Sequence, residues 1–171
     1  MLFVAFFMLS GQAWAQIDTR RMGDYFQMMV PSYALGLAVS EDGWTATKQL
    51  GLSMGSMQLS VMALKYTINE KRPDYVEGDR KDSFPSGHTA MAFSGATFVH
   101  KRYGLKRAAI PYLMATYTGY SRVATDKHYI HDVIAGAMIA SFWTWLFVDK
   151  IENIVLTADT RGVAITYVKR F

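Results

Sequence analysis

Five long stretches without a charged side chain most constrain how this chain can fold. They contain 14 to 18 residues each and cover 25–40, 49–64, 83–100, 108–121 and 133–148. Each stretch is longer than a usual β-strand and suits a buried α-helix. All lie at or below the lower edge of the length that a membrane-spanning helix needs. The pattern therefore predicts a helical protein and leaves a soluble core and a membrane bundle both open.

The two ends of the chain differ from this helical part. Residues 1–15 carry no charge and end in Ala13-Trp14-Ala15, a pattern of small residues typical of a signal-peptide cleavage site. An uncleaved membrane anchor is the alternative. Residues 151–171 read as strand, turn and strand, a β-hairpin-like tail that we expect to pack on the helices or on a partner. Between them, 16–150 is expected to form one helical domain.

The overall charge excludes few functions but disfavours one. The chain has 171 residues and a net charge of +4, with no dense basic stripe interleaved with aromatic residues. Nucleic-acid binding is therefore not expected. A mild basic surplus fits an anionic substrate or an anionic lipid equally well. The absence of cysteine excludes disulfides, thiolate metal sites and a cysteine nucleophile.

Four basic residues crowd one short connection, at Lys101, Arg102, Lys106 and Arg107. If the uncharged stretches span a bilayer, this loop is expected to be cytoplasmic. The segments 65–88 and 122–132 would then share the opposite side. An ordinary solvated loop between two helices explains the same charges.

A first cluster of possible site residues is Lys65, Arg72 and Pro73. Lys65 and Arg72 are seven positions apart, about two helical turns, so we expect them to share one helix face. Pro73 disfavours helical geometry at Arg72 and marks the helix end. An arginine fork beside a lysine point charge can hold a phosphate, although such a pair alone is more often solvated surface.

A second cluster is Pro85-Ser86-Gly87-His88, placed where a helix is expected to begin. Unpaired backbone N–H groups at a helix start favour an anion. Ser86 can cap the helix or donate its hydroxyl, and Gly87 lets the backbone approach a ligand. His88 can give or take a proton near neutral pH. A capped helix with a surface histidine explains the same residues.

A third cluster is Ser121-Arg122, followed by His128 and Asp132. His128 and Asp132 are four positions apart and lie on one helix face. Asp132 can accept a hydrogen bond from one ring nitrogen, which leaves the other nitrogen free to attack. His131 points elsewhere on this helix and is not expected to be catalytic. Each cluster alone has an ordinary structural explanation, but all three occur together by chance with a probability on the order of 10⁻⁸ to 10⁻⁷.

The combined pattern Lys-x6-Arg-Pro, Pro-Ser-Gly-His and Ser-Arg-x5-His-x3-Asp resembles the type 2 phosphatidic acid phosphatase family. That family shares its fold with bacterial class A acid phosphatases and vanadium haloperoxidases. The resemblance spans Lys65 to Asp132 with every motif position filled. It implies an all-α helical bundle of this type with a phosphate site at one end.

The resemblance also implies a role for each motif residue. His128 would be the nucleophile that forms a phosphohistidine, Asp132 would orient it, and His88 would be the general acid and later the base. The phosphate would be held by five residues: Lys65, Arg72, Ser86, Gly87 and Arg122. These cations and a helix N-terminus can stabilise phosphoryl transfer. No carboxylate cluster with metal spacing is visible in the sequence, so neither a metal nor another cofactor is expected.

The expected function is a phosphatase that is exported to the periplasm and acts at the membrane. Its substrate would be a phosphomonoester or diphosphate, with a lipid favoured by the apolar character and the basic loop. A soluble periplasmic acid phosphatase acting on small phosphoesters is the main alternative. A vanadium haloperoxidase and a non-catalytic phosphate-binding membrane module are further alternatives. The sequence sets no oligomeric state.

Overall fold

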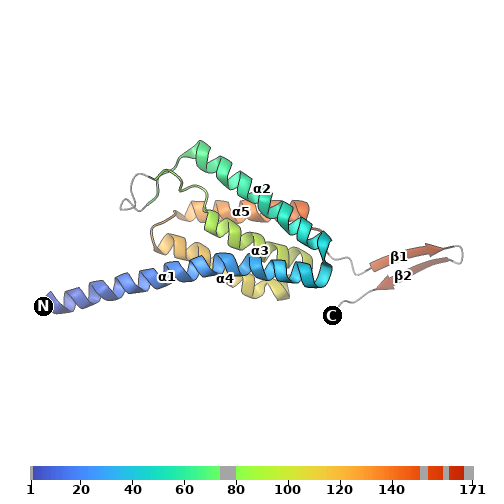
Figure 1. The fold of residues 1–171 in the computed structure, drawn as a ribbon, viewed down its shortest axis with the longest axis horizontal. Helices are drawn as coiled ribbons and strands as arrows, with labels where there is room; N and C mark the ends of the chain where they lie inside the picture. Colours follow the sequence, from blue (N-terminus) through green and yellow to red (C-terminus); the bar gives the residue numbers. More distant parts are fainter. Residues whose placement is uncertain (1, 74–79, 151–153, 160–161, 168–171) are drawn as a thin grey trace.

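The described residues form a bundle of five α-helices (Figure 1). The computed structural model describes the backbone of residues 2–73, 80–150, 154–159 and 162–167, and the side chains of 18–73 and 80–150. The helices are α1 (Leu2–Leu37), α2 (Trp44–Ile68), α3 (Gly87–Tyr103), α4 (Leu105–Ala124) and α5 (Ile130–Phe147). A short π-helical turn, η1 (Ala38–Asp42), joins α1 to α2. Each helix contains most of one uncharged stretch, so the predicted helical bundle is confirmed.

Helix α3 lies at the centre and packs against all four other helices. Its buried residues are mainly small, including Ala90, Ala92, Gly95 and Ala96. Small side chains allow helix backbones to approach closely, as they do at helix interfaces in membranes. At Gly95 the backbone of α3 lies against Pro31 of α1, and an added Cβ on Gly95 would lie 2.8 Å from the proline nitrogen. The core is therefore held by close backbone packing around α3.

The close contact at Gly136 gives a stability prediction. A Cβ at this position of α5 would lie 2.5 Å from the carbonyl oxygen of Ser86, which directly precedes α3. The glycine therefore allows α5 to pack closely against the start of α3. We expect Gly136→Ala to lower the free energy of unfolding by about 1–3 kcal/mol through overpacking. Gly51 of α2 has no atom within 4 Å of such a Cβ and is the matched control. Thermal unfolding in detergent measures both variants. Equal stability of Gly136→Ala and Gly51→Ala would contradict the prediction.

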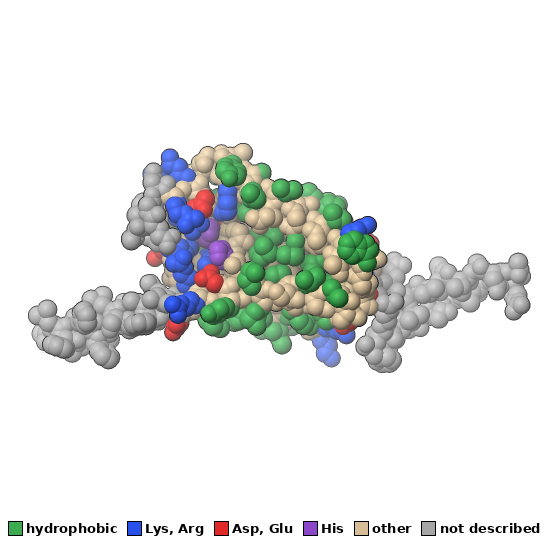
Figure 2. Space-filling view, in the orientation of Figure 1, with side chains coloured by type: hydrophobic (Ala, Val, Ile, Leu, Met, Phe, Trp, Pro, Cys, Tyr) green, Lys and Arg blue, Asp and Glu red, His purple; other side chains and the backbone are tan. Residues whose placement is uncertain are grey.

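The outer surface of the bundle is unusually apolar. Large hydrophobic side chains on four helices are more than half exposed, among them Leu59, Ile110, Leu113, Met138 and Phe142. Figure 2 shows hydrophobic side chains over the middle of the molecule, while charged side chains gather at its two ends. By length and composition α5 can cross a membrane. Small residues inside and large apolar residues outside are the arrangement expected where lipid covers the helices.

The C-terminal segment contains two strands, β1 (Ile154–Asp159) and β2 (Gly162–Tyr167). They pair antiparallel, with Ile154 opposite Tyr167. Among the described residues neither strand contacts a helix, and Figure 1 shows the pair extending away from the bundle. The expectation that this tail packs on the helices is therefore wrong, and contact with a partner remains a prediction. The turn expected between the strands falls partly outside the described residues.

The start of the chain is part of α1, which runs without a break from Leu2 to Leu37. Figure 1 shows its first part extending beyond the other helices. The side chains of 1–17 lie outside the described residues. Cleavage of a signal peptide after residue 15 remains a prediction.

Candidate functional site

One end of the bundle gathers the residues that the three motifs contain. The end of α2, the start of α3, the end of α4 and the start of α5 meet here. A cavity of about 260 Å³ lies here, lined by His88 and His128 and by residues of α1, of the connection between α2 and α3, and of the end of α4. Five basic residues line it as well: Arg20, Arg72, Arg80, Arg122 and Lys127. Figure 2 shows histidine and basic side chains gathered at this end of the molecule. Such a concentration of positive charge favours an anionic ligand.

His128 and Asp132 form a buried pair at the start of α5. The Nδ1 atom of His128 lies 3.4 Å from Oδ2 of Asp132, and the two side chains are 2% and 0% exposed. An ionised carboxylate only accepts hydrogen bonds, so Nδ1 carries the proton. The Nε2 atom of His128 is then the unprotonated nitrogen. His128 itself precedes α5, which begins at Ile130, so the prediction that the two residues lie on one helix face is wrong. That Asp132 orients the ring for catalysis remains a prediction.

Asp132 is itself held in place by three donors on the same oxygen. Besides His128, Oδ2 accepts a hydrogen bond of 2.6 Å from the Ser83 hydroxyl and one of 2.9 Å from the Tyr129 backbone N–H. Asp132 is the third residue of α5 and closes a capping box with Tyr129. A carboxylate in this position satisfies helix-start N–H groups that would otherwise lack partners. The same bond that caps α5 therefore fixes the carboxylate beside His128.

Arg122 is a buried arginine whose three nitrogens all have partners. Nη1 donates to Oδ1 of Asp24 at 2.8 Å, Nη2 to the carbonyl oxygen of Arg20 at 2.7 Å, and Nε to the hydroxyl of Ser121 at 3.1 Å. Its side chain is 3% exposed, yet it lines the cavity. Helix α1 comes this close because Gly23 faces Ser121, where an added Cβ would lie 1.9 Å from the hydroxyl oxygen. The first helix thus forms part of the site.

His88 lies at the rim of the cavity and faces the same carboxylate. Its Nε2 atom is 3.3 Å from Oδ1 of Asp24, and its side chain is 40% exposed. Burial and the charge of Arg122 lower the pKa of His88 to about 4, although Asp24 opposes the shift. Burial also lowers the pKa of His128, against the opposing hydrogen bond from Asp132. Both rings are therefore neutral at pH 7 when the cavity holds no anion.

These shifts predict an NMR titration that separates the two rings from ordinary histidines. We expect His88 to titrate near pH 4 and His128 below the usual value of 6.5, because burial disfavours the charged imidazolium in both. Ring resonances of the labelled protein, assigned with His88→Asn and His128→Asn, measure both values. Titration of His128 at or above pH 6.5 would contradict this prediction, because it would show that Asp132 affects the pKa of His128 more than burial does.

Lys65 and Arg72 do not share a helix face, and this sequence prediction is wrong. Helix α2 ends at Ile68, and Asn69 follows in the left-handed conformation with φ of 52°. The two cations meet instead at Asp82. Lys65 donates its Nζ to the backbone carbonyl of Asp82, and Arg72 donates to the carboxylate oxygens at 2.9 and 3.1 Å. Only Arg72 of the two lines the cavity.

Asp82 links the connection between α2 and α3 to the cavity. Its carboxylate accepts from Arg80 at 2.9 Å as well as from Arg72. Partial burial raises its pKa, but the hydrogen bonds from the two arginines outweigh this effect and hold the pKa at about 2. Asp82 is therefore ionised across the physiological range and orients the guanidinium of Arg72. One edge of that guanidinium contacts Asp82.

Ser86 and Gly87 do not line the cavity, but they form the start of α3 next to it. Ser86 is the N-cap of α3, and its hydroxyl oxygen accepts a hydrogen bond from the Thr89 N–H. Its own N–H donates to the backbone carbonyl of Asp132 at 3.0 Å. These bonds tie the start of α3 to the start of α5, which places His88 and His128 on the same cavity. The expected cap is present.

Several residues of the site were not among the predicted site residues. Asp24, Asp82 and Ser83 pair with predicted residues, and Arg20, Gln27, Arg80 and Lys127 line the cavity. Asp24 lies 98 positions before Arg122, so no local spacing could reveal it. Ser83 lies 49 positions before Asp132. Ser83 lies two positions and Asp82 three positions before Pro85 of the Pro-Ser-Gly-His motif, and this neighbourhood was their only signal in the sequence.

The helical bundle and the motif residues around one cavity define the class of protein. The family model of the PAP2 superfamily matches residues 46–155. The chain therefore belongs to the PAP2 superfamily, and the resemblance noted from its motifs is confirmed.

Two curated proteins and two crystal structures are similar to this chain. A lipid A 1-phosphatase of Porphyromonas gingivalis is 40% identical over 91 residues, which are 52% of this chain and 20% of that protein. A lipid A 4'-phosphatase of Helicobacter pylori is 42% identical over 66 residues, 39% of this chain and 33% of that protein. The matches thus span a fifth to a third of these relatives.

The structural similarity extends over most of the chain. The crystal structure of Aquifex aeolicus LpxE has a TM-score of 0.61 and 28% sequence identity, covering 74% of this chain and 83% of that one. The crystal structure of the first transmembrane PAP2 type phosphatidylglycerolphosphate phosphatase from Bacillus subtilis has a TM-score of 0.58 and 21% sequence identity, and the match covers 78% of this chain and 75% of that one. The second similarity shows a shared fold.

Proposed function

We propose that this protein is a phosphatase that removes a phosphate group from a phosphorylated lipid through a phosphohistidine at His128. The observation that carries the proposal is the buried His128–Asp132 pair at a cavity lined by basic side chains. A protein that only bound phosphate would need the cations, but it would not need an oriented histidine nucleophile and a second histidine beside it. The names of the two curated relatives support lipid A as the substrate to test first.

The first step is an in-line attack on phosphorus. The Nε2 atom of His128 attacks, and the bond from phosphorus to the lipid oxygen breaks. His88 in its protonated form donates a proton to that oxygen, so the lipid leaves as an alcohol. The bound phosphate lies near His88 and favours its protonated form, which raises the pKa from its low value in the free site. Arg72 and Arg122 stabilise the charge on the equatorial oxygens.

The second step restores the enzyme. A water molecule attacks the phosphohistidine, and His88, now neutral, accepts a proton from it. The nitrogen–phosphorus bond breaks, and inorganic phosphate leaves His128 neutral. Asp132 stabilises the positive charge on the ring between the two steps, because its carboxylate keeps the proton on Nδ1. In both steps the guanidinium groups of Arg72 and Arg122 stabilise the negative charge on the equatorial oxygens of the phosphoryl group.

The apolar surface supports a lipid substrate. Besides the exposed side chains described above, an apolar hollow of about 680 Å³ follows α5 and is lined by residues including Ile134, Met138, Phe142 and Trp145. It contains no titratable side chain and is separate from the polar cavity. We propose that this face contacts membrane lipid while the phosphate reaches His128 at the end of the bundle.

The charge distribution supports an orientation in the membrane. The basic connection between α3 and α4 lies at the opposite end of α3 from His88, about 25 Å away for a helix of 17 residues. Its arginines are tied to acidic residues, Arg102 to Asp42 and Arg107 to Glu41. A basic loop on the cytoplasmic side would place the cavity on the periplasmic side. Export and periplasmic activity are part of this proposal.

The experiment that tests the proposal measures phosphate release by the purified full chain in detergent micelles. Matched substrates are lipid A, phosphatidate and undecaprenyl diphosphate, with p-nitrophenyl phosphate and glycerol phosphate as soluble esters. We expect kcat/KM to be at least about tenfold higher for one of the lipids, because the apolar face positions only a lipid. Equal or faster turnover of the soluble esters would instead identify a soluble-type acid phosphatase. Vanadate, which mimics pentacoordinate phosphorus, should inhibit either phosphatase.

A further inference from the structure

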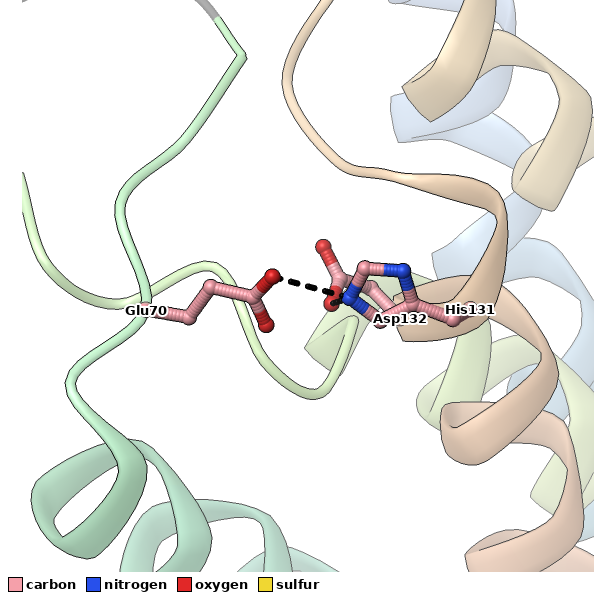
Figure 3. A group of neighbouring side chains, drawn as sticks. All are labelled: Glu70, His131 and Asp132. Atoms are coloured by element: carbon pink, nitrogen blue, oxygen red, sulfur yellow. Dashed lines mark hydrogen bonds and ion pairs between the residues drawn. The ribbon is translucent and has the colours of Figure 1, made fainter.

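A second group of ligand-type side chains lies beside the cavity and outside the phosphatase machinery, except for one shared residue. Figure 3 shows Glu70, His131 and Asp132 pointing toward one another from the segment after α2 and from the start of α5. The Nε2 atom of His131 is 2.9 Å from Oε1 of Glu70 and 3.3 Å from Oδ1 of Asp132. One ligand atom from each residue lies within 4.8 Å of the others.

Asp132 carries an unusual polar atom in this group. Its Oδ2 atom accepts the hydrogen bonds that position the catalytic pair, whereas Oδ1 is buried and accepts no hydrogen bond. The side chain is 0% exposed. A buried carboxylate oxygen without a partner is costly and rare. Oδ1 is directed at the Nε2 atom of His131, so a ligand placed between these residues would satisfy it.

We propose that Glu70, His131 and Asp132 form a binding site for a divalent cation of the zinc class. One imidazole nitrogen and two carboxylate oxygens are a ligand set that zinc accepts, with a water in the fourth position. Two ligands of one tetrahedral zinc ion lie about 3.4 Å apart when each is about 2.0–2.1 Å from the metal. The observed separations of 2.9 and 3.3 Å from the Nε2 atom are close to this value.

The surroundings of the group fix its ligands in place. The His131 ring is stacked on Tyr129, with centroids 5.3 Å apart and planes 8° from parallel, and on Phe84 at 6.0 Å. The backbone carbonyl of Glu70 accepts a hydrogen bond of 3.0 Å from the N–H of Ser83. Preorganised ligands reduce the cost of binding a metal. The bound cation would tie the segment after α2 to the start of α5.

The proposed site stands apart from the proposed phosphatase activity, because its test measures binding of the metal alone. The purified full chain, freed of its affinity tag and treated with EDTA, is titrated with zinc chloride by calorimetry. We expect one zinc ion per chain, and affinity at least about tenfold weaker in His131→Ala and in Glu70→Gln. His100→Ala is the matched control, since His100 contacts Tyr112 and Trp145 at the other end of α3.

A second measurement guards against a variant that simply misfolds. Zinc should raise the unfolding temperature of the wild type and of His100→Ala, because a ligand that binds only the folded state stabilises it. At the same zinc concentration it should raise that of His131→Ala and Glu70→Gln by less, and the helical content of both by circular dichroism should match the wild type. Absence of zinc binding by the wild type, or equal affinity in all four proteins, would overturn the proposal.

Discussion

Substituting His128→Ala is expected to lower the rate of phosphate release by on the order of 10⁴-fold or more. The imidazole is nearly fully buried, pairs with Asp132 and lines the cavity. Alanine leaves the cations in place, so the phosphate still binds but meets no nucleophile. Among the residues that line the described cavity, His88 is the other imidazole, and it faces Asp24. The measurement is steady-state kcat on the lipid that the wild type prefers.

The control for this variant is His100→Ala, which removes a histidine from the opposite end of α3. We expect its kcat to equal that of the wild type, because its ring contacts Tyr112 and Trp145 rather than the cavity. Binding of inorganic phosphate by His128→Ala should stay within about threefold of the wild type. Turnover by His128→Ala at the wild-type rate would exclude the covalent route.

Substituting Arg122→Lys is expected to lower kcat/KM by about 10²–10³-fold. Three guanidinium nitrogens of Arg122 each hold a different partner, at Asp24, Arg20 and Ser121. A lysine ammonium is a single point donor and cannot keep this geometry. The charge therefore stays near the cavity while its position and the anchoring of α1 are lost. Steady-state kinetics on the same lipid measure the effect.

The matched variant is Arg107→Lys in the basic connection between α3 and α4. Arg107 is 39% exposed and pairs with Glu41, far from the cavity. Exposed ion pairs contribute little, so we expect no more than a twofold change in kcat/KM. If Arg122→Lys behaved like Arg107→Lys, the cavity would need only a positive charge and not the arginine fork.

Much of the fold could be predicted from the uncharged stretches. They place the helices because a buried or lipid-covered helix excludes charge along its whole length. The helix ends were less predictable. The stretch 83–100 begins at Ser83, but α3 begins at Gly87, because Ser86 is its N-cap and Pro85 lies before it. The exposed apolar surface depends on how the helices pack, which the sequence alone left open.

The candidate site was predictable where its residues are close in sequence. His128 and Asp132 are four positions apart and do form a pair, but His128 precedes α5, so they meet because Asp132 caps the start of that helix and not because they share a helix face. Lys65 and Arg72 failed as a pair, because Asn69 ends the helix between them and Asp82 brings them together instead. A left-handed residue changes the chain direction, and helical spacing no longer applies beyond it.

Contacts between distant segments could not be predicted. Asp24 on α1 reaches both Arg122 and His88, yet nothing near it in the sequence marks it as a site residue. The grouping of Glu70 with His131 likewise joins positions 61 apart. Carboxylates of this kind are found only once packing of the helices is known. Asp24, for example, places a negative charge among the basic residues of the cavity, and the motifs alone do not predict it.

The measurement that tests the account most directly is capture of the covalent intermediate. Wild-type protein is mixed with lipid A labelled with ³²P, quenched at successive times under conditions that preserve phosphoramidates, and digested for mapping of the label. We predict label on His128 in the wild type and in Asp132→Asn, and none on His128→Ala. Turnover by the wild type with label on another side chain, or with no labelled protein at any time, would contradict the account.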